Sequence, residues 1–74
     1  MIYVFRLFAV EPDGGRRLIH TAKQRIKSKN LVDSQANAMM KNLLFDGRRA
    51  EICSISDQAG SFVCEVKTEA LEHA

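Results

Sequence analysis

The chain has no tryptophan, a single proline, four glycines and only two cysteines among its 74 residues. Two cysteines are too few for the disulfide framework of a small secreted domain. The sequence also lacks the paired cysteine and histidine spacings that form zinc sites. We therefore expect no metal and no cofactor, and a protein that works in the reducing cytoplasm.

Long apolar runs and secretory signals are missing as well. The longest apolar stretch, Ile2–Val10, is interrupted by Arg6 and lacks the basic flank of a secretory signal. It is also far shorter than the roughly 20 apolar residues that cross a bilayer. We therefore expect no membrane partner.

Motifs that support catalysis are scarce. The sequence contains no serine motif, no carboxylate pair and no glycine-rich phosphate loop. His20 is the one plausible base for a thiol nucleophile, but nothing in the sequence brings it to Cys53 or Cys64. The simpler interpretation of both cysteines is as small, half-buried hydrophobic side chains. We predict a protein without catalytic activity and without a small-molecule substrate.

What the chain does have is the composition of a globular domain. Hydrophobic residues make up 46% of the sequence and charged residues 27%, and the net charge is +2. A chain of this length forms one domain. We expect that domain to cover residues 1–70, with a frayed tail at residues 71–74. The small net charge does not by itself indicate a nucleic-acid ligand.

Hydrophobic periodicity predicts four strands and one helix in the order ββαββ. The first strand is apolar on both faces, whereas the second alternates basic with mainly apolar residues. The helix carries an apolar stripe and ends before Gly47, where a C-terminal glycine is expected. The predicted elements are strands at Ile2–Val10, Arg16–Lys29, Arg49–Ser56 and Ser61–Lys67, and a helix at about Leu31–Asp46.

These elements favour a two-layer α+β fold, with one helix on one face of a four-stranded, mainly antiparallel sheet. A strand that is apolar on both faces is usually central, and a basic strand suits an edge. We therefore predict strand order 2-1-4-3, counted along the chain, with strands 1 and 4 parallel. This order resembles the β-grasp arrangement, a likeness of architecture that carries no function.

The register of the first hairpin is open between two alternatives. A two-residue turn pairs Phe5 with Ala22. A three-residue loop with a bulge at Gly14 pairs Phe5 with Thr21 instead. We favour the first alternative, because it keeps Lys23 off the face that holds Phe5. In the second hairpin, a three-residue loop with a bulge at Gly60 predicts the pairs Glu51–Lys67, Ile52–Val66 and Ile55–Val63.

One helix covers only one face of a sheet, so the other face is the first candidate for function. Its predicted residues are apolar and contiguous, which is typical of an interaction site. The predicted interface consists of Ile2, Val4, Phe8, Val10, Ile55 and Val63. We predict that the protein binds a second copy of itself, as a homodimer, or another protein through this face.

The basic segment from Arg16 to Lys29 is the second candidate. Like charges at alternate strand positions can follow a nucleic-acid backbone, although lysines on an edge strand also prevent aggregation. Stacking aromatics are few, and rings such as Phe8 and Phe62 are expected in the core. The candidate phosphate-binding residues are Lys23, Arg25, Lys27, Lys29, Arg48 and Arg49. Nucleic-acid binding is thus the alternative function.

Overall fold

The computed structural model of the chain describes residues 1–68, which form four strands, one α-helix and a short 3-10 helix. The α+β class and the ββαββ order are confirmed. The predicted tail at residues 71–74 lies outside the described residues, as do the last two residues of the predicted domain. The elements are β1 (Ile2–Val10), β2 (Arg16–Arg25), η1 (Lys29–Leu31), α1 (Val32–Asn42), β3 (Ile52–Asp57) and β4 (Phe62–Lys67).

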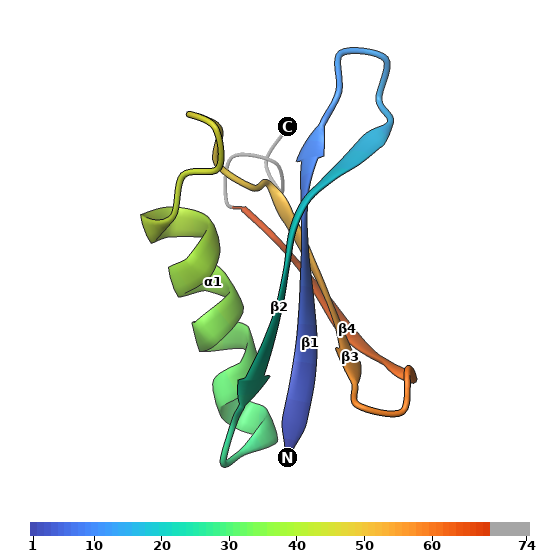
Figure 1. Ribbon diagram of the computed structural model, residues 1–74, viewed down its shortest axis with the longest axis vertical. Helices are drawn as coiled ribbons and strands as arrows, with labels where there is room; N and C mark the ends of the chain where they lie inside the picture. Colours follow the sequence, from blue (N-terminus) through green and yellow to red (C-terminus); the bar gives the residue numbers. More distant parts are fainter. Residues whose placement is uncertain (69–74) are drawn as a thin grey trace.

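The four strands form one antiparallel sheet in the order β2-β1-β3-β4, with α1 on one side of it (Figure 1). As predicted, β1 is central and β2 lies at an edge, but the predicted order 2-1-4-3 and its parallel pair are wrong. β3 and not β4 adjoins β1, because β3 holds no charged residue before Asp57 and can be buried in the middle. β4 carries Glu65 and Lys67, which suit an exposed edge.

The first hairpin combines both predicted registers. Over most of its length Phe5 pairs with Ala22, which confirms the favoured alternative. The register shifts by one between Leu7 and Phe8, so that Phe8 pairs with Leu18 and Ile19 is an extra, bulged residue of β2. The pairs from Ile2–Arg25 to Leu7–His20 therefore keep the favoured register, in which Lys23 lies on the face away from the helix.

The second hairpin differs from its predicted register. Ile52 pairs with Lys67 and Ile55 pairs with Cys64, so the predicted pairs Glu51–Lys67, Ile52–Val66 and Ile55–Val63 are wrong. The cause is a register shift between Ile55 and Ser56, which makes Val63 an extra residue of β4. A one-residue shift moves side chains to the opposite face, so this difference affects the composition of both faces.

The second strand and the helix are both shorter than predicted. β2 ends at Arg25, and α1 ends at Asn42, where Leu43 takes an extended conformation. The cause at the helix end is a tight turn: Asp46 (φ 53°) and Gly47 (φ 79°) both have positive φ, and Phe45 and Arg48 exchange backbone hydrogen bonds around them. Asp46-Gly47 is therefore a two-residue hairpin turn, and Gly47 does not cap the helix.

The hydrophobic core lies between α1 and one face of the sheet. Phe5, Leu7, Cys53 and Ile55 of the strands are fully buried there against Val32 and its neighbours on the helix. Burying apolar side chains in this way provides the main stabilisation of a small domain. Among residues 1–68, no helix combines the length and the apolar character needed to cross a membrane.

Candidate functional site

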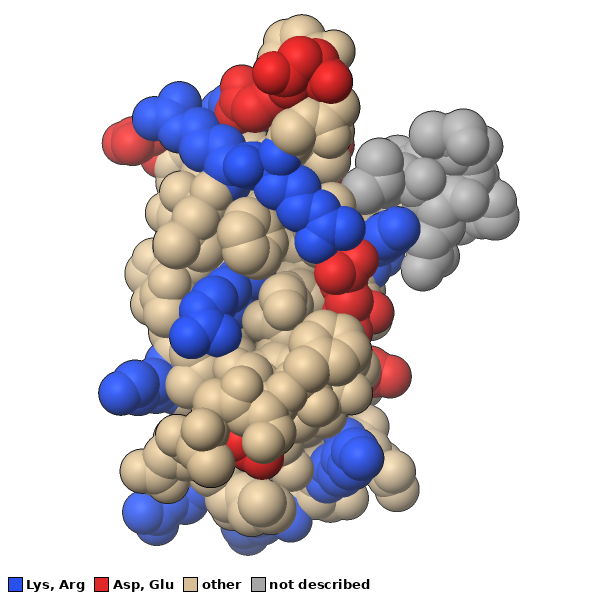
Figure 2. All heavy atoms as spheres, turned by 90° about the vertical axis from the view of Figure 1, so that its right-hand side faces the viewer, with Lys and Arg blue, Asp and Glu red and all other residues tan. Residues whose placement is uncertain are grey.

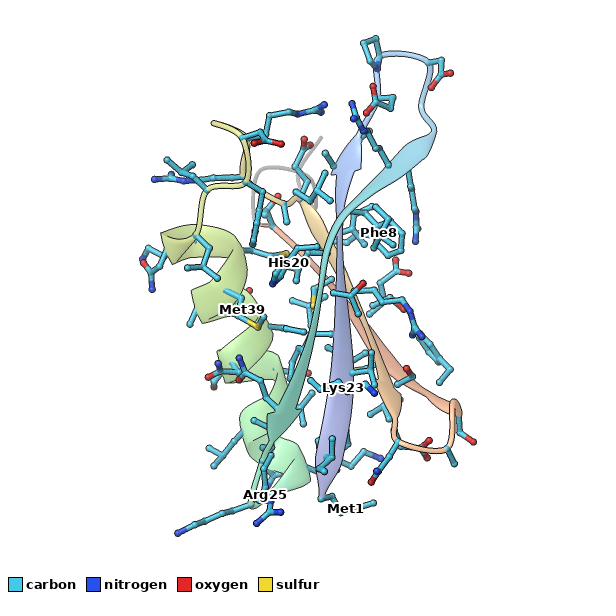
Figure 3. The ribbon with its side chains drawn as sticks, in the orientation of Figure 1. Met1, Phe8, His20, Lys23, Arg25 and Met39 are labelled. Carbon is cyan, nitrogen blue, oxygen red and sulfur yellow. The ribbon has the colours of Figure 1, made fainter. Side chains whose placement is uncertain are left out.

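Within residues 1–68, no helix lies over the face of the sheet that points away from α1, and we call this face the free face. Cross-strand partners share a face, so the strand registers determine which side chains it holds. Figure 3 shows Phe8 on this side of the sheet, with His20 and Met39 on the helix side. The free face consists of Ile2, Val4, Arg6, Phe8 and Val10 of β1, Arg16, Leu18, Thr21, Lys23 and Arg25 of β2, Ile52, Ser54 and Ser56 of β3, and Phe62, Glu65 and Lys67 of β4.

The structure divides the predicted apolar interface between two places. Its members Ile2, Val4, Phe8 and Val10 lie on the free face. Ile55 does not, because β3 adjoins β1 and pairs Ile55 with Phe5 on the helix side, where Ile55 is fully buried. Val63 is half-buried against the core. The strand order thus accounts for Ile55, and the bulge in β4, which makes Val63 an extra residue, accounts for Val63.

A polar group lies at the centre of the free face. The side chain of Arg6 projects from the middle of β1, and its Nη1 donates to Ser56 Oγ at 2.9 Å. Ser56 is only 5% exposed, although no helix of the described part of the chain lies over it. Arg6 itself remains exposed. The hydrogen bond therefore holds a guanidinium group against the sheet while leaving its other donors directed to solvent.

An ion pair spans the free face from edge to edge. Arg16 Nη1 donates to Glu65 Oε2 at 2.9 Å and Nη2 donates to Oε1 at 3.2 Å, a two-point contact between β2 and β4. The two strands are separated by β1 and β3, so these side chains extend across the sheet. The hydrogen bonds from Arg16 lower the pKa of Glu65, and the same contact raises the pKa of Arg16.

The free face is strongly asymmetric in charge. Among the described residues, its cationic side chains are Arg6, Arg16, Lys23, Arg25 and Lys67, and its only acidic side chain is Glu65. That single carboxylate is already paired with Arg16. Figure 2 shows this side of the molecule, with basic side chains spread over it and most of the visible acidic ones at its top and along one edge. The face thus presents four cations that have no acidic partner on it.

The six predicted phosphate-binding residues do not converge. Lys23 and Arg25 lie on the free face, whereas Lys27 and Lys29 follow the end of β2. The two arginines after the helix lie farther from the predicted surface. Arg48 lies at the opposite end of the sheet, where it donates to Glu11 Oε1 at 3.4 Å and to the carbonyl of Val10. Arg49 lines a hollow beside the helix residues Met40 and Lys41.

One exposed ring and two cations of the free face were not predicted from the sequence. Phe62 is 68% exposed, so the expectation that its ring lies in the core is wrong, whereas Phe8, a member of the predicted interface, is half-buried on the free face. Arg6 and Lys67 were not candidates either, whereas Arg16 begins the basic segment that was a candidate. The alternation of side chains along β1 could have identified Arg6, since it places Arg6 on the same face as Val4 and Phe8. The same alternation along β4 could have identified Lys67 once β3 is placed next to β1.

The helix side offers little for chemistry. Burial, followed by the charge of Cys64, raises the pKa of the Cys53 thiol to about 12, and burial also raises the pKa of Cys64, whose Sγ donates to Asp33 Oδ1 at 3.4 Å. Raised pKa values disfavour the nucleophilic thiolate. His20 stacks on Phe45 with ring centroids 4.6 Å apart. Within residues 1–68, no three His, Cys, Asp or Glu side chains are grouped as metal ligands.

Comparison of the chain with models of protein families, with curated proteins and with solved structures finds no match. The geometry and charge of the free face are therefore the features that point to a function.

Proposed function

We propose that the protein is a binding module for single-stranded nucleic acid and that the strand lies on the free face. The observation that carries the proposal is the concentration of charge: five cations and one acid lie on this face among exposed and half-exposed rings. A polyanion gains affinity from such a surface by releasing its counterions. The proposal reverses the priority of the sequence interpretation, in which protein association came first.

The rings favour a single strand over a duplex. Bases of single strands can stack on exposed aromatic side chains, whereas bases within a duplex offer no free faces. Phe62 stands next to Ser56 in the row of cross-strand neighbours that also contains Val4 and Lys23. A base stacked on Phe62 would thus lie on the same face as the lysine. Four strands at about 4.8 Å spacing give a face roughly 15–20 Å wide, enough for a few nucleotides.

The proposal is tested by the salt dependence of oligonucleotide binding. We expect an unstructured eight-nucleotide strand, followed by fluorescence anisotropy, to bind with a log–log salt slope of roughly −3, from four phosphate contacts at −0.7 each. Affinity should then fall roughly 50-fold between 50 and 200 mM salt. Binding that is absent at low salt, or that does not change with salt, would exclude the proposal. Duplex DNA and an acidic peptide serve as competitors, and stronger binding of either would replace the single strand as the ligand.

Charge position, as distinct from net charge, is tested by two matched double variants. Lys23→Gln with Lys67→Gln removes two charges from the free face and should weaken strand binding roughly 10- to 25-fold near 0.1 M salt. Lys41→Gln with Arg49→Gln removes the same charge from the helix side and should change binding little. Equal losses in both variants would show that binding is general attraction to a basic protein.

Self-association through the free face is the second candidate. Leu18 is 51% exposed beside Phe8, and together with Phe62 it gives the face exposed apolar area. Two copies packed face to face would, however, oppose like charges, which disfavours the dimer at low salt. A homodimer should therefore strengthen as salt rises, opposite to nucleic-acid binding. Light scattering at high protein concentration and at two salt concentrations distinguishes them, and a monomer in both conditions rules the homodimer out.

A further inference from the structure

The sheet has an open hollow at the end where β2 leads into η1. Its volume is about 380 Å³, and residues of β1, of the β2–η1 connection and of the β3–β4 hairpin line it. Pockets that hold small ligands begin at about 300 Å³. The hollow is therefore large enough for a single nucleotide and too small for a longer segment.

The walls of the hollow combine cations with rings. Lys27 and Lys29 line one part of it, and the exposed ring of Phe62 and the almost fully buried Tyr3 line another. The only acidic side chain in the lining is Asp57, whose Oδ1 already accepts the backbone N–H of Ser61 at 2.9 Å. Neither lysine forms an ion pair with any described residue. Two free ammonium groups next to aromatic surface suit a phosphate that is attached to a base.

Phe62 connects the hollow to the free face, since its ring belongs to both. We propose that the hollow binds the terminal phosphate and the terminal nucleotide of the strand that lies on the free face. This inference rests on the proposed function and extends it to the class of strand: one that ends in a phosphate. It also gives a role to Lys27 and Lys29, which lie beyond the end of β2 and outside the free face.

The test compares eight-nucleotide strands of one sequence that carry hydroxyl groups at both ends, a 5′-phosphate or a 3′-phosphate. Their affinities are measured by isothermal titration calorimetry, without labels at the ends. We expect one terminal phosphate to tighten binding roughly threefold to tenfold, as two exposed charge contacts allow. In the variant Lys27→Gln with Lys29→Gln that ratio should fall to one. The readout is the ratio of the affinities of the phosphate-ended and hydroxyl-ended strands for the same protein. This ratio cancels the general loss of affinity that follows from removing two positive charges.

The outcomes separate the two proposals. If the hydroxyl-ended strand binds but neither phosphate tightens binding, or if the gain survives in the double variant, the terminal-phosphate site is wrong and the proposed function stands. If the hydroxyl-ended strand does not bind, the proposed function is wrong. Adenosine monophosphate then tests the hollow alone by NMR: shifts at Phe62 that the double variant abolishes retain it as a nucleotide site, and their absence excludes it.

Discussion

The two faces of the sheet are built from the same strands but bury their side chains by different means. On the helix side, Phe5, Leu7 and Ile55 are fully buried against an apolar helix stripe. On the free face, Val4 is 8% exposed and Ile52 3% exposed, although no helix within residues 1–68 lies over them. We infer that long side chains of the neighbouring strands cover them, because Val4 pairs with Lys23 and Ile52 pairs with Lys67. Burial alone therefore does not identify which face is packed permanently.

The two faces differ in the free energy needed to expose their buried side chains to water. Exposing the helix side means returning a large apolar area to water at about 25 cal/mol per Å². The cover of the free face is hydrated charge, held by the Arg6–Ser56 hydrogen bond and the exposed Arg16–Glu65 ion pair. Exposed ion pairs contribute little to stability. The free face can therefore exchange its own cover for a ligand, while the helix side cannot.

The largest effect that tests this comparison is on stability. Phe5→Ala, on the helix side, should lower the free energy of unfolding by about 3–5 kcal/mol, because it empties part of a fully packed core. Phe62→Ala, which removes the same ring from the free face, should cost less than about 0.5 kcal/mol, because that ring is 68% exposed. Urea denaturation followed by circular dichroism measures both. Similar losses in the two variants would mean that the free face is part of the permanent core.

The second effect is on binding. Phe62→Ala should weaken oligonucleotide binding by about 1–3 kcal/mol, the usual contribution of one base stacked on a ring. Leu18→Ala is the matched control, since it also removes exposed apolar area from the free face but no ring. Fluorescence anisotropy should show a loss for Phe62→Ala alone. Equal losses for the two variants would indicate a hydrophobic partner and not a stacked base.

A third effect compares two buried side chains on the same strand. Ile55→Val should cost about 1 kcal/mol, because the rigid core cannot fill the space of a lost methylene. Ile52→Val should cost about half of that, because the side chains that cover Ile52 are free to settle into the space. The midpoints of urea denaturation measure the difference. An equal cost at both positions would contradict the idea of a movable cover.

Much of this arrangement was accessible from the sequence. The apolar residues on both sides of β1 indicated a central strand, and the pairing of Phe5 with Ala22 followed from the turn and from the positions of the basic residues. The extent of α1 was overestimated because Leu43 and Leu44 continue the helical spacing. Both are exposed, and the Asp46-Gly47 turn directs the chain away from the helix axis.

The candidate site was harder to predict, because it depends on two non-local facts. Whether β3 or β4 adjoins β1 decides the face of Ile55, and local periodicity carries no information on that choice. The bulges at Ile19 and Val63 each shift a register by one residue. Because side chains alternate, such a shift changes which residues share a face. Arg6, read as an interruption of an apolar strand, is in fact the centre of the free face.

A smaller effect concerns the acidic residue of the free face. Glu65→Gln should tighten oligonucleotide binding roughly twofold to fivefold, because it removes the one negative charge that residues 1–68 place on this face and releases Arg16 for phosphate. Asp46→Asn changes the net charge equally in the turn after α1 and is the matched control. Anisotropy at fixed salt measures both. Unchanged or weaker binding for Glu65→Gln would show that the ion pair positions the ligand site and does not compete with the ligand.

The smallest effect is the titration of that same ion pair, which reports how firmly the cover of the free face is held. Arg16 lowers the pKa of Glu65 below its ordinary value of 4.5. A carboxyl group with a lowered pKa stabilises the fold at pH values above its unfolded pKa, and this contribution is lost as the pH falls through the folded pKa. We therefore expect a small loss of stability confined to pH values below about 4.5.

NMR titration of the Glu65 carboxyl should give the lowered pKa in the native protein and the ordinary value in Arg16→Gln. Arg17→Gln removes the same charge from the neighbouring position, which pairs with Ala9 on the helix side, and should leave the titration unchanged. If Glu65 instead titrates at its ordinary value in the native protein, the ion pair does not persist in solution, and a ligand can reach Arg16 without displacing Glu65.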